Sequence, residues 1–87
     1  MSNVIWRIVV DPAVHEVLRK LPRNDQEAVE RVIDGMALHP YGGDIQKLGG
    51  QAAWRRRVRD YRLKFFIYQE SRSVFIYELK RRTTNTY

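Results

Sequence analysis

Residues 53–80 read AWRRRVRDYRLKFFIYQESRSVFIYELK, and this stretch decides the fold. It contains three runs rich in β-branched and aromatic residues, at about 53–59, 62–69 and 73–80, which favours three strands. Few residues separate the runs, and Glu70-Ser71-Arg72 is short enough for a hairpin turn. The pattern therefore predicts an antiparallel meander in the C-terminal half.

A strand and a helix are predicted before the meander. Residues 4–10 are β-branched or aromatic except for Arg7, which favours a strand. Asp11-Pro12 is then typical of a helix start, because Asp caps a helix and Pro is tolerated at its first position. An apolar stripe with i, i+3, i+4, i+7 spacing supports this helix. Its members are Val14, Val17, Leu18 and Leu21.

A second helix and a glycine-rich loop complete the order. Asn24 and Glu27 have the spacing of a capping box. The helix is expected to stop near His39-Pro40, because a residue before proline avoids the α region. Residues 40–52 hold four of the five glycines and are predicted to form a loop. The apolar stripe of this helix is Val29, Val32, Ile33 and Met36.

The resulting order, β-α-α-β-β-β, predicts a single α+β domain over residues 1–87. Each helix has one apolar stripe and therefore one side to bury. We expect an N-terminal helical hairpin packed on one face of an antiparallel sheet.

The positive charge is concentrated in the meander. The chain has 16 basic and 10 acidic side chains, a net charge of +6. Residues 1–52 hold six basic and seven acidic side chains, a balance of −1, whereas residues 53–87 hold ten and three, a balance of +7. The absence of Cys and the presence of only two His exclude a disulfide scaffold and a His-rich metal site.

Targeting signals are not recognisable in the sequence. No apolar run is long enough to span a membrane, and the N-terminus lacks the charged and apolar regions of a signal peptide. We expect a cytoplasmic protein whose electropositive segment binds nucleic acid, an acidic protein or a membrane surface.

Strand alternation is expected to gather the charge on one face of the sheet. Arg55, Arg57 and Arg59 stand at alternate positions, as do Arg62 and Lys64. If the helices cover one face, these cations line the other. Arginine binds phosphate through two donors and stacks on bases, which favours nucleic acid as the ligand.

A solvated basic face is the general alternative. Five arginines within residues 55–62, with Asp60 as the sole acid nearby, make it less favourable here, because they repel one another unless an anion neutralises them. Tyrosines among cations are also typical of single-strand binding. For Tyr68 and Tyr77, however, we favour simple core or sheet packing, and for Trp54 a place in the core.

Several motifs resemble the RelE/ParE superfamily of type II toxins, and most closely its RelE-type mRNA interferases. They are Leu21-Pro22, Lys47-Leu48-Gly49-Gly50, the run from Trp54 to Arg62, and Arg81-Arg82 followed by Tyr87. The resemblance covers essentially the whole chain, and the spacing from Arg81 to Tyr87 indicates the RelE branch. The β-α-α-β-β-β order is also the fold of that family.

This resemblance implies a ribosome-dependent endoribonuclease that cuts mRNA in the ribosomal A site. The reaction of the family is metal-independent attack of a ribose 2′-OH on the adjacent phosphate. The implied partners are the ribosome, mRNA and a cognate antitoxin, without a small-molecule cofactor or a membrane.

The resemblance also implies roles for individual residues. Arg62 corresponds to an arginine at the substrate phosphate, and Arg81 to one that stabilises the transition state or the leaving group. Tyr87 corresponds to a tyrosine that stacks on the substrate base and is a candidate general base. Lys47 lies in a motif linked to the fold and to ribosome contact. The expected RNA- or phosphate-binding residues are Lys47, Arg55, Arg57, Arg59, Lys64 and Arg82.

The chain departs from the family pattern in two ways. Arg59 stands where members often have Gly, so the strand geometry is expected to differ there. Arg55 and Arg57 stand where Lys is common. Because arginine keeps its proton, these two can clamp phosphate but cannot accept the 2′-OH proton. The candidate bases are Tyr87, Lys64 and the C-terminal carboxylate.

Two alternative functions fit the same motifs. One is a ParE-like inhibitor of DNA gyrase without nuclease activity, since the motifs before Arg81 are shared across the superfamily. The other is a non-catalytic RNA-binding module, which would use the charge of residues 55–62 and would not need Tyr87.

Overall fold

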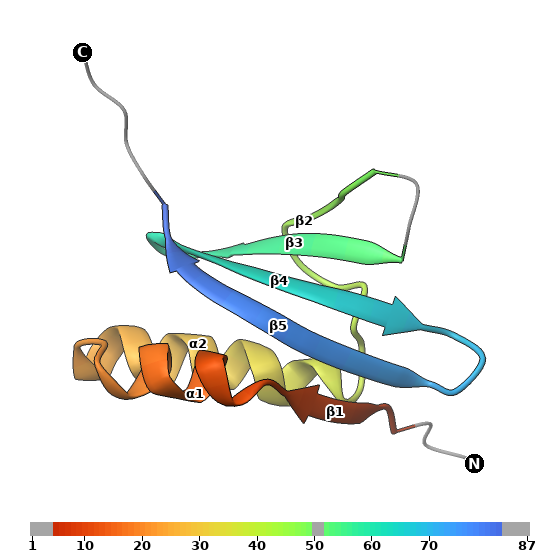
Figure 1. The fold of residues 1–87 in the computed structure, drawn as a ribbon, viewed down its shortest axis with the longest axis horizontal. Coiled ribbons are helices and arrows are strands. Elements are labelled where there is room, and N and C mark those ends of the chain that lie inside the picture. Colours follow the sequence, from red (N-terminus) through yellow and green to blue (C-terminus); the bar gives the residue numbers. More distant parts are fainter. Residues whose placement is uncertain (1–4, 50–51, 83–87) are drawn as a thin grey trace.

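The computed structural model describes residues 5–49 and 52–82, which form two helices and one five-stranded sheet (Figure 1). The order across the sheet is β1-β5-β4-β3-β2, with β1 parallel to β5 and all other neighbours antiparallel. The elements are β1 (Arg7–Val10), α1 (Pro12–Arg19), α2 (Arg23–Met36), β2 (Ile45–Lys47), β3 (Ala53–Val58), β4 (Tyr61–Tyr68) and β5 (Ser73–Arg81).

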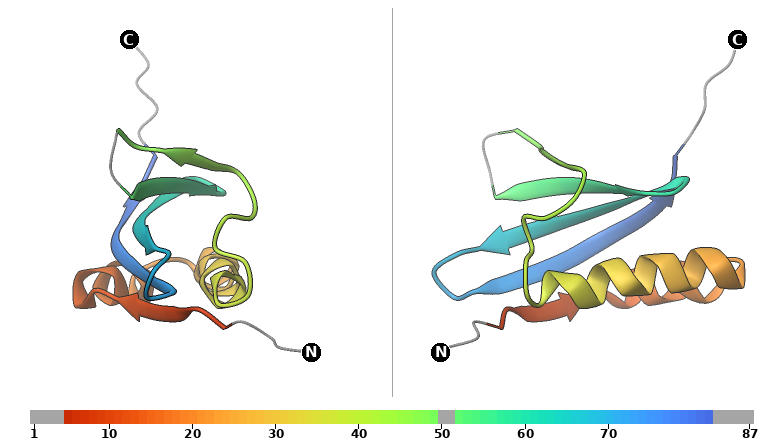
Figure 2. Two further views of the ribbon diagram at one scale, coloured as in Figure 1. Left: turned by 90° about the vertical axis from the view of Figure 1, so that its right-hand side faces the viewer. Right: turned by 180° about the vertical axis from the view of Figure 1, so that it is seen from behind.

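Both helices lie on one side of the sheet (Figures 1 and 2), as predicted. The core forms between them and the strands, and its largest fully buried side chains include Phe65, Met36, Leu63 and Ile76. Helix α1 begins as expected, since the Asp11 carboxylate accepts the N–H of Ala13 at 2.8 Å. The predicted α+β fold is therefore confirmed. In the part of the chain that is described, no helix is long and apolar enough to cross a membrane.

The burial pattern of strand β4 distinguishes the two faces of the sheet. Its odd-numbered residues, from Tyr61 to Ile67, are at most 4% exposed and face the helices. Its even-numbered residues, from Arg62 to Tyr68, are half-buried or exposed and point the other way. We call the side that the helices leave uncovered the open face.

Two local expectations differ from the structure. The predicted loop contains the short strand β2, because residues 45–47 pair with β3. Helix α2 begins at Arg23, with Pro22 as its N-cap and no capping side chain, so Asn24 is not the cap. The N–H of Gln26 donates to the Pro22 carbonyl at 2.9 Å, which closes the first turn without a side-chain cap.

A β-bulge interrupts the pairing of β4 with β5. Phe65 faces Ile76, but the preceding residue, Lys64, faces Glu78. Tyr77 is therefore an extra residue in β5 without a partner of its own. Such an insertion shifts the alternation of the strand by one residue.

The bulge decides which side chains of β5 reach the open face. Beyond it Leu79 is 2% exposed and belongs to the core, whereas Glu78 and Lys80 share the open face with residues of β4. Arg81 lies within β5 rather than after it. It pairs with Tyr61, so its position in the register is on the helix-covered side.

Candidate nucleic-acid interface

A row of three cations crosses the open face. Arg57, Arg62 and Lys80 come from β3, β4 and β5 and occupy directly paired positions. We call them the cation row. Paired like charges destabilise a sheet, and within residues 5–49 and 52–82 no carboxylate forms an ion pair with any of the three. The row is therefore a place where a bound anion would relieve repulsion.

The neighbouring row on the same face consists of Arg55, Lys64 and Glu78, and each of these side chains has a polar partner within the chain. The Arg55 guanidinium donates to the Gln46 side-chain oxygen. Lys64 Nζ lies 3.2 Å from Glu78 Oε2, in a pair that is about one-third exposed. Arg55 and Lys64 thus lie beside the cation row, but each already has a partner.

Arg59 does not share a face with Arg55 and Arg57, contrary to the prediction. Strand β3 ends at Val58, and Arg59 lies in the following turn with φ +54°. Strand alternation does not apply to this left-handed conformation, which glycine adopts without strain. The Arg59 guanidinium donates to Asp25 Oδ1 on α2 at 3.3 Å.

Asp25 also binds Tyr61 from the helix-covered side. The Tyr61 hydroxyl donates to Asp25 Oδ2 at 2.9 Å. Burial, followed by this hydrogen bond and the charge of Asp25, raises the pKa of Tyr61 above its ordinary value, while the charge of Arg81 acts in the opposite direction. The turn before Arg62 is thereby tied to α2, by an acid far away in the sequence.

Three other predicted site residues, Lys47, Arg81 and Arg82, lie outside the cation row. Lys47 pairs with Trp54 and places Nζ 5.9 Å from the centre of its ring, on the helix-covered side. The Arg82 N–H donates to the Asp60 carbonyl at 2.6 Å, and its buried Nε has no hydrogen-bond partner among the described residues. Tyr87 lies outside the described residues.

An aromatic stack occupies the open face beyond the two rows. Phe66 lies between Tyr68 and Tyr77, with ring centroids 5.9 and 4.7 Å away and interplanar angles of 22° and 26°. The two tyrosines therefore pack on the sheet, as predicted, but on its open face. Trp54 packs against the core from the other side, with the Tyr41 ring 5.6 Å away.

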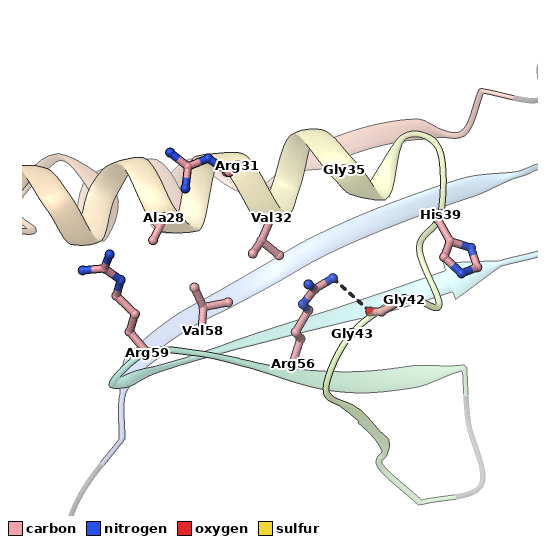
Figure 3. Close-up of a pocket in the computed structure, with 10 residues that line it drawn as sticks. All are labelled: Ala28, Arg31, Val32, Gly35, His39, Gly42, Gly43, Arg56, Val58 and Arg59. Atoms are coloured by element: carbon pink, nitrogen blue, oxygen red, sulfur yellow. Dashed lines mark hydrogen bonds between the residues drawn. The ribbon is translucent and has the colours of Figure 1, made fainter.

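A second basic surface lies between α2 and β3 (Figure 3). It is an open groove of about 500 Å³ with an apolar floor and a cationic rim. In the rim, Arg56 donates to the Gly42 carbonyl at 2.9 Å. The floor is Ala28, Val32 and Val58, and the cations are Arg31, Arg56 and Arg59.

Lys80, Glu78 and Asp25 contribute to the site or its surroundings but are not among the residues predicted from the sequence. A signal for the first two exists. Counting in twos from Val74 and Ile76 would place both charges in the core, and that conflict points to a bulge. Asp25 carries no such signal, because its partners lie more than thirty residues away.

The fold resembles that of solved RelE structures, although no protein-family model and no curated protein matches the sequence. A chain of the archaeal RelE–RelB complex from Pyrococcus horikoshii OT3 matches with a TM-score of 0.84 at 23% identity, over 93% of this chain and 99% of that one. The RelBE2 toxin–antitoxin complex from Mycobacterium tuberculosis gives 0.74 at 23% identity, over 91% and 100%. The YoeB/ParE toxin from Agrobacterium tumefaciens gives 0.72 at 13% identity, over 88% and 99%. The likeness establishes a RelE-like fold.

Proposed function

We propose that this chain is the toxin of a type II toxin–antitoxin pair and a ribosome-dependent mRNA endoribonuclease of the cytoplasm. The observation that carries the proposal is the cation row, in which Arg57, Arg62 and Lys80 meet on the open face without a carboxylate partner among the described residues. The RelE-like fold supports it, because the matched structures include toxin–antitoxin complexes.

The cation row suits phosphate chemistry. In the proposed reaction the ribose 2′-OH attacks the adjacent phosphorus, the bond to the 5′-oxygen breaks, and a 2′,3′-cyclic phosphate forms. Negative charge grows on the phosphoryl oxygens on the way, and donors already held in place stabilise it. Arg57 and Arg62 offer forked donors for those oxygens, and Lys80 adds a third cation. No metal is needed for this step.

The proton transfers require other groups. Arg57 and Arg62 keep their protons, so they cannot serve as the base. Lys64 is held in an ion pair with Glu78. Following the family resemblance, we propose base stacking and the base role for Tyr87, and stabilisation of the leaving oxygen for Arg81. Because the register position of Arg81 is on the helix-covered side, this role requires its side chain to reach around the end of β5 to the substrate.

A ribosome assay tests the nuclease proposal. Ribosomes translating a defined mRNA are treated with the wild type, with Arg62→Ala, or with Arg19→Ala as a control on the exposed side of α1. We expect an A-site cut by the wild type and the control, and cleavage about 100-fold slower with Arg62→Ala. No A-site cut, or equal cutting by all three, contradicts the proposal.

A gyrase inhibitor is the second candidate, favoured by the match to a YoeB/ParE toxin. It predicts loss of DNA supercoiling when the wild type is added to gyrase. Inhibition of supercoiling without any A-site cut would establish it in place of the nuclease. RNA binding without either activity would instead support the non-catalytic module.

The cognate antitoxin is the proposed protein partner. The groove between α2 and β3 supports this, because its apolar floor and cationic rim match an acidic amphipathic segment. Co-expression with the product of the adjacent reading frame tests it. We expect a stable complex that Arg31→Glu weakens, whereas Arg19→Glu on α1 leaves it intact.

A further inference from the structure

We propose that the aromatic stack of Tyr68, Phe66 and Tyr77 binds an unpaired RNA base, on the same strand whose phosphates occupy the cation row. The inference rests on the proposed function for the identity of that RNA as mRNA. The site itself follows from the geometry of the open face.

The stack has a free end. Phe66 contacts a ring on either side, with near-parallel planes, and Tyr68 at one end is 45% exposed. A base placed on the Tyr68 ring would continue a stack that already exists. Flat rings stack on bases regardless of base identity, because every base has a π-face. The chemical class of the ligand is therefore an unpaired nucleobase.

The stack and the cation row lie on one path along β4. Tyr68 and Arg62 share the open face and are six residues apart in the strand, which corresponds to about 20 Å. Lys64 and Phe66 occupy the positions between them. An extended single strand several nucleotides long would place its phosphates over the cations and a more distant base on Tyr68.

The arrangement favours RNA over an apolar protein segment. Phe66 and Tyr77 lie on two adjacent inner strands of the sheet, with cations immediately beyond them. Aromatic residues on the inner strands of an open sheet, beside basic residues, form a common single-strand RNA platform. An apolar protein partner would leave the neighbouring cation row uncompensated.

The experiment measures binding of a fluorescent single-stranded RNA to the full chain without ribosomes. The probe is a 2′-O-methyl oligoadenylate, which cannot be cleaved, and its counterpart has abasic sites at every position. The variants are Tyr68→Ala, Tyr68→Trp and, as a matched control for an exposed apolar residue, Leu38→Ala, which is 68% exposed. Thermal unfolding verifies that each variant is folded.

We expect Tyr68→Ala to weaken oligoadenylate binding about tenfold, as for loss of one base–aromatic stack. Tyr68→Trp retains or improves binding, and Leu38→Ala is unchanged. The abasic probe binds all four proteins alike. The salt dependence separates the two parts of the site: Tyr68→Ala keeps the slope of log K against log salt, whereas Arg62→Ala lowers its magnitude by about 0.7.

Three outcomes overturn the inference. The first is that the wild type does not bind oligoadenylate, and the second is that Tyr68→Ala binds it like the wild type. The third is that Tyr68→Ala no longer forms a complex with the co-expressed antitoxin but still binds RNA, which assigns the stack to a protein partner. Base-dependent binding together with an absence of A-site cleavage would support the base site and refute the nuclease, so the two failures are distinguishable.

Discussion

Successive residues of β4 point alternately to the helix-covered face and to the open face of the sheet. The two faces have opposite surroundings, because one is buried against the helices and the other is partly exposed and positively charged. Leu63 and Phe65 are fully buried against the helices, where removal from water stabilises the fold. Arg62, one residue before Leu63, faces Arg57 and Lys80. Burial on the helix-covered face thus stabilises the domain, whereas the cation row on the open face does not stabilise the fold.

The largest expected effect is on the helix-covered face. Phe65→Ala should lower the free energy of unfolding by about 3–5 kcal/mol, because it removes a fully buried ring. That is a large share of the roughly 5–15 kcal/mol of a typical domain. Phe66→Ala, on the open face, is the matched control and should cost less. Equal losses in urea unfolding would contradict the division between the faces.

Alkaline pH tests the same face through Tyr61. Its pKa is raised in the fold, mainly by burial and then by Asp25, so the folded state holds the proton at a pH where the unfolded state has lost it. The stabilisation that the Tyr61 proton contributes should therefore be fully present below about pH 10, the ordinary pKa of tyrosine. It should be lost as the pH rises through the raised pKa.

Tyr61→Phe is the variant that checks this. It has no proton to lose, so the alkaline decline in urea-unfolding free energy should be smaller than in the wild type. An unchanged decline would mean that Tyr61 is not the group that titrates. Tyr68→Phe, on the open face, serves as the control.

On the open face, loss of a charge should not destabilise the fold. Arg62→Ala removes one member of a row of paired like charges, so we expect the free energy of unfolding to stay constant or to rise by about 0.2–1 kcal/mol. Thermal unfolding at low salt measures this, and the gain should shrink as salt is added. A clear loss of stability would show that the row is structural.

The smallest effect concerns the one carboxylate of the neighbouring row. A double-mutant cycle on Lys64 and Glu78 should give a coupling of about 0–1 kcal/mol, since the pair is partly exposed. Glu78→Gln should also strengthen RNA binding and steepen its salt dependence, because it adds one net positive charge to the open face. Weaker binding would place Glu78 among the groups that hold the ligand.

Much of the fold could be predicted because its signals are local. The helical stripes and the runs of β-branched and aromatic residues depend on near neighbours in the chain, and α1, α2 and the meander follow them closely. For β4 even the faces were predictable, since its alternation runs without interruption from Tyr61 to Tyr68. Arg55 and Arg57 share the open face with Arg62 and Lys64 for the same reason.

The candidate site was predictable only in part. The concentration of charge in residues 53–87 and the alternation of β3 and β4 determine that cations gather on one face. The sequence signals a bulge in β5, but three features needed the tertiary structure: the position of that bulge at Tyr77, the left-handed turn that ties Arg59 to Asp25, and the pairing of Lys64 with Glu78. Each depends on which strand or helix lies opposite. Pairing between distant segments is a property of the packed chain, whereas alternation belongs to the strand itself.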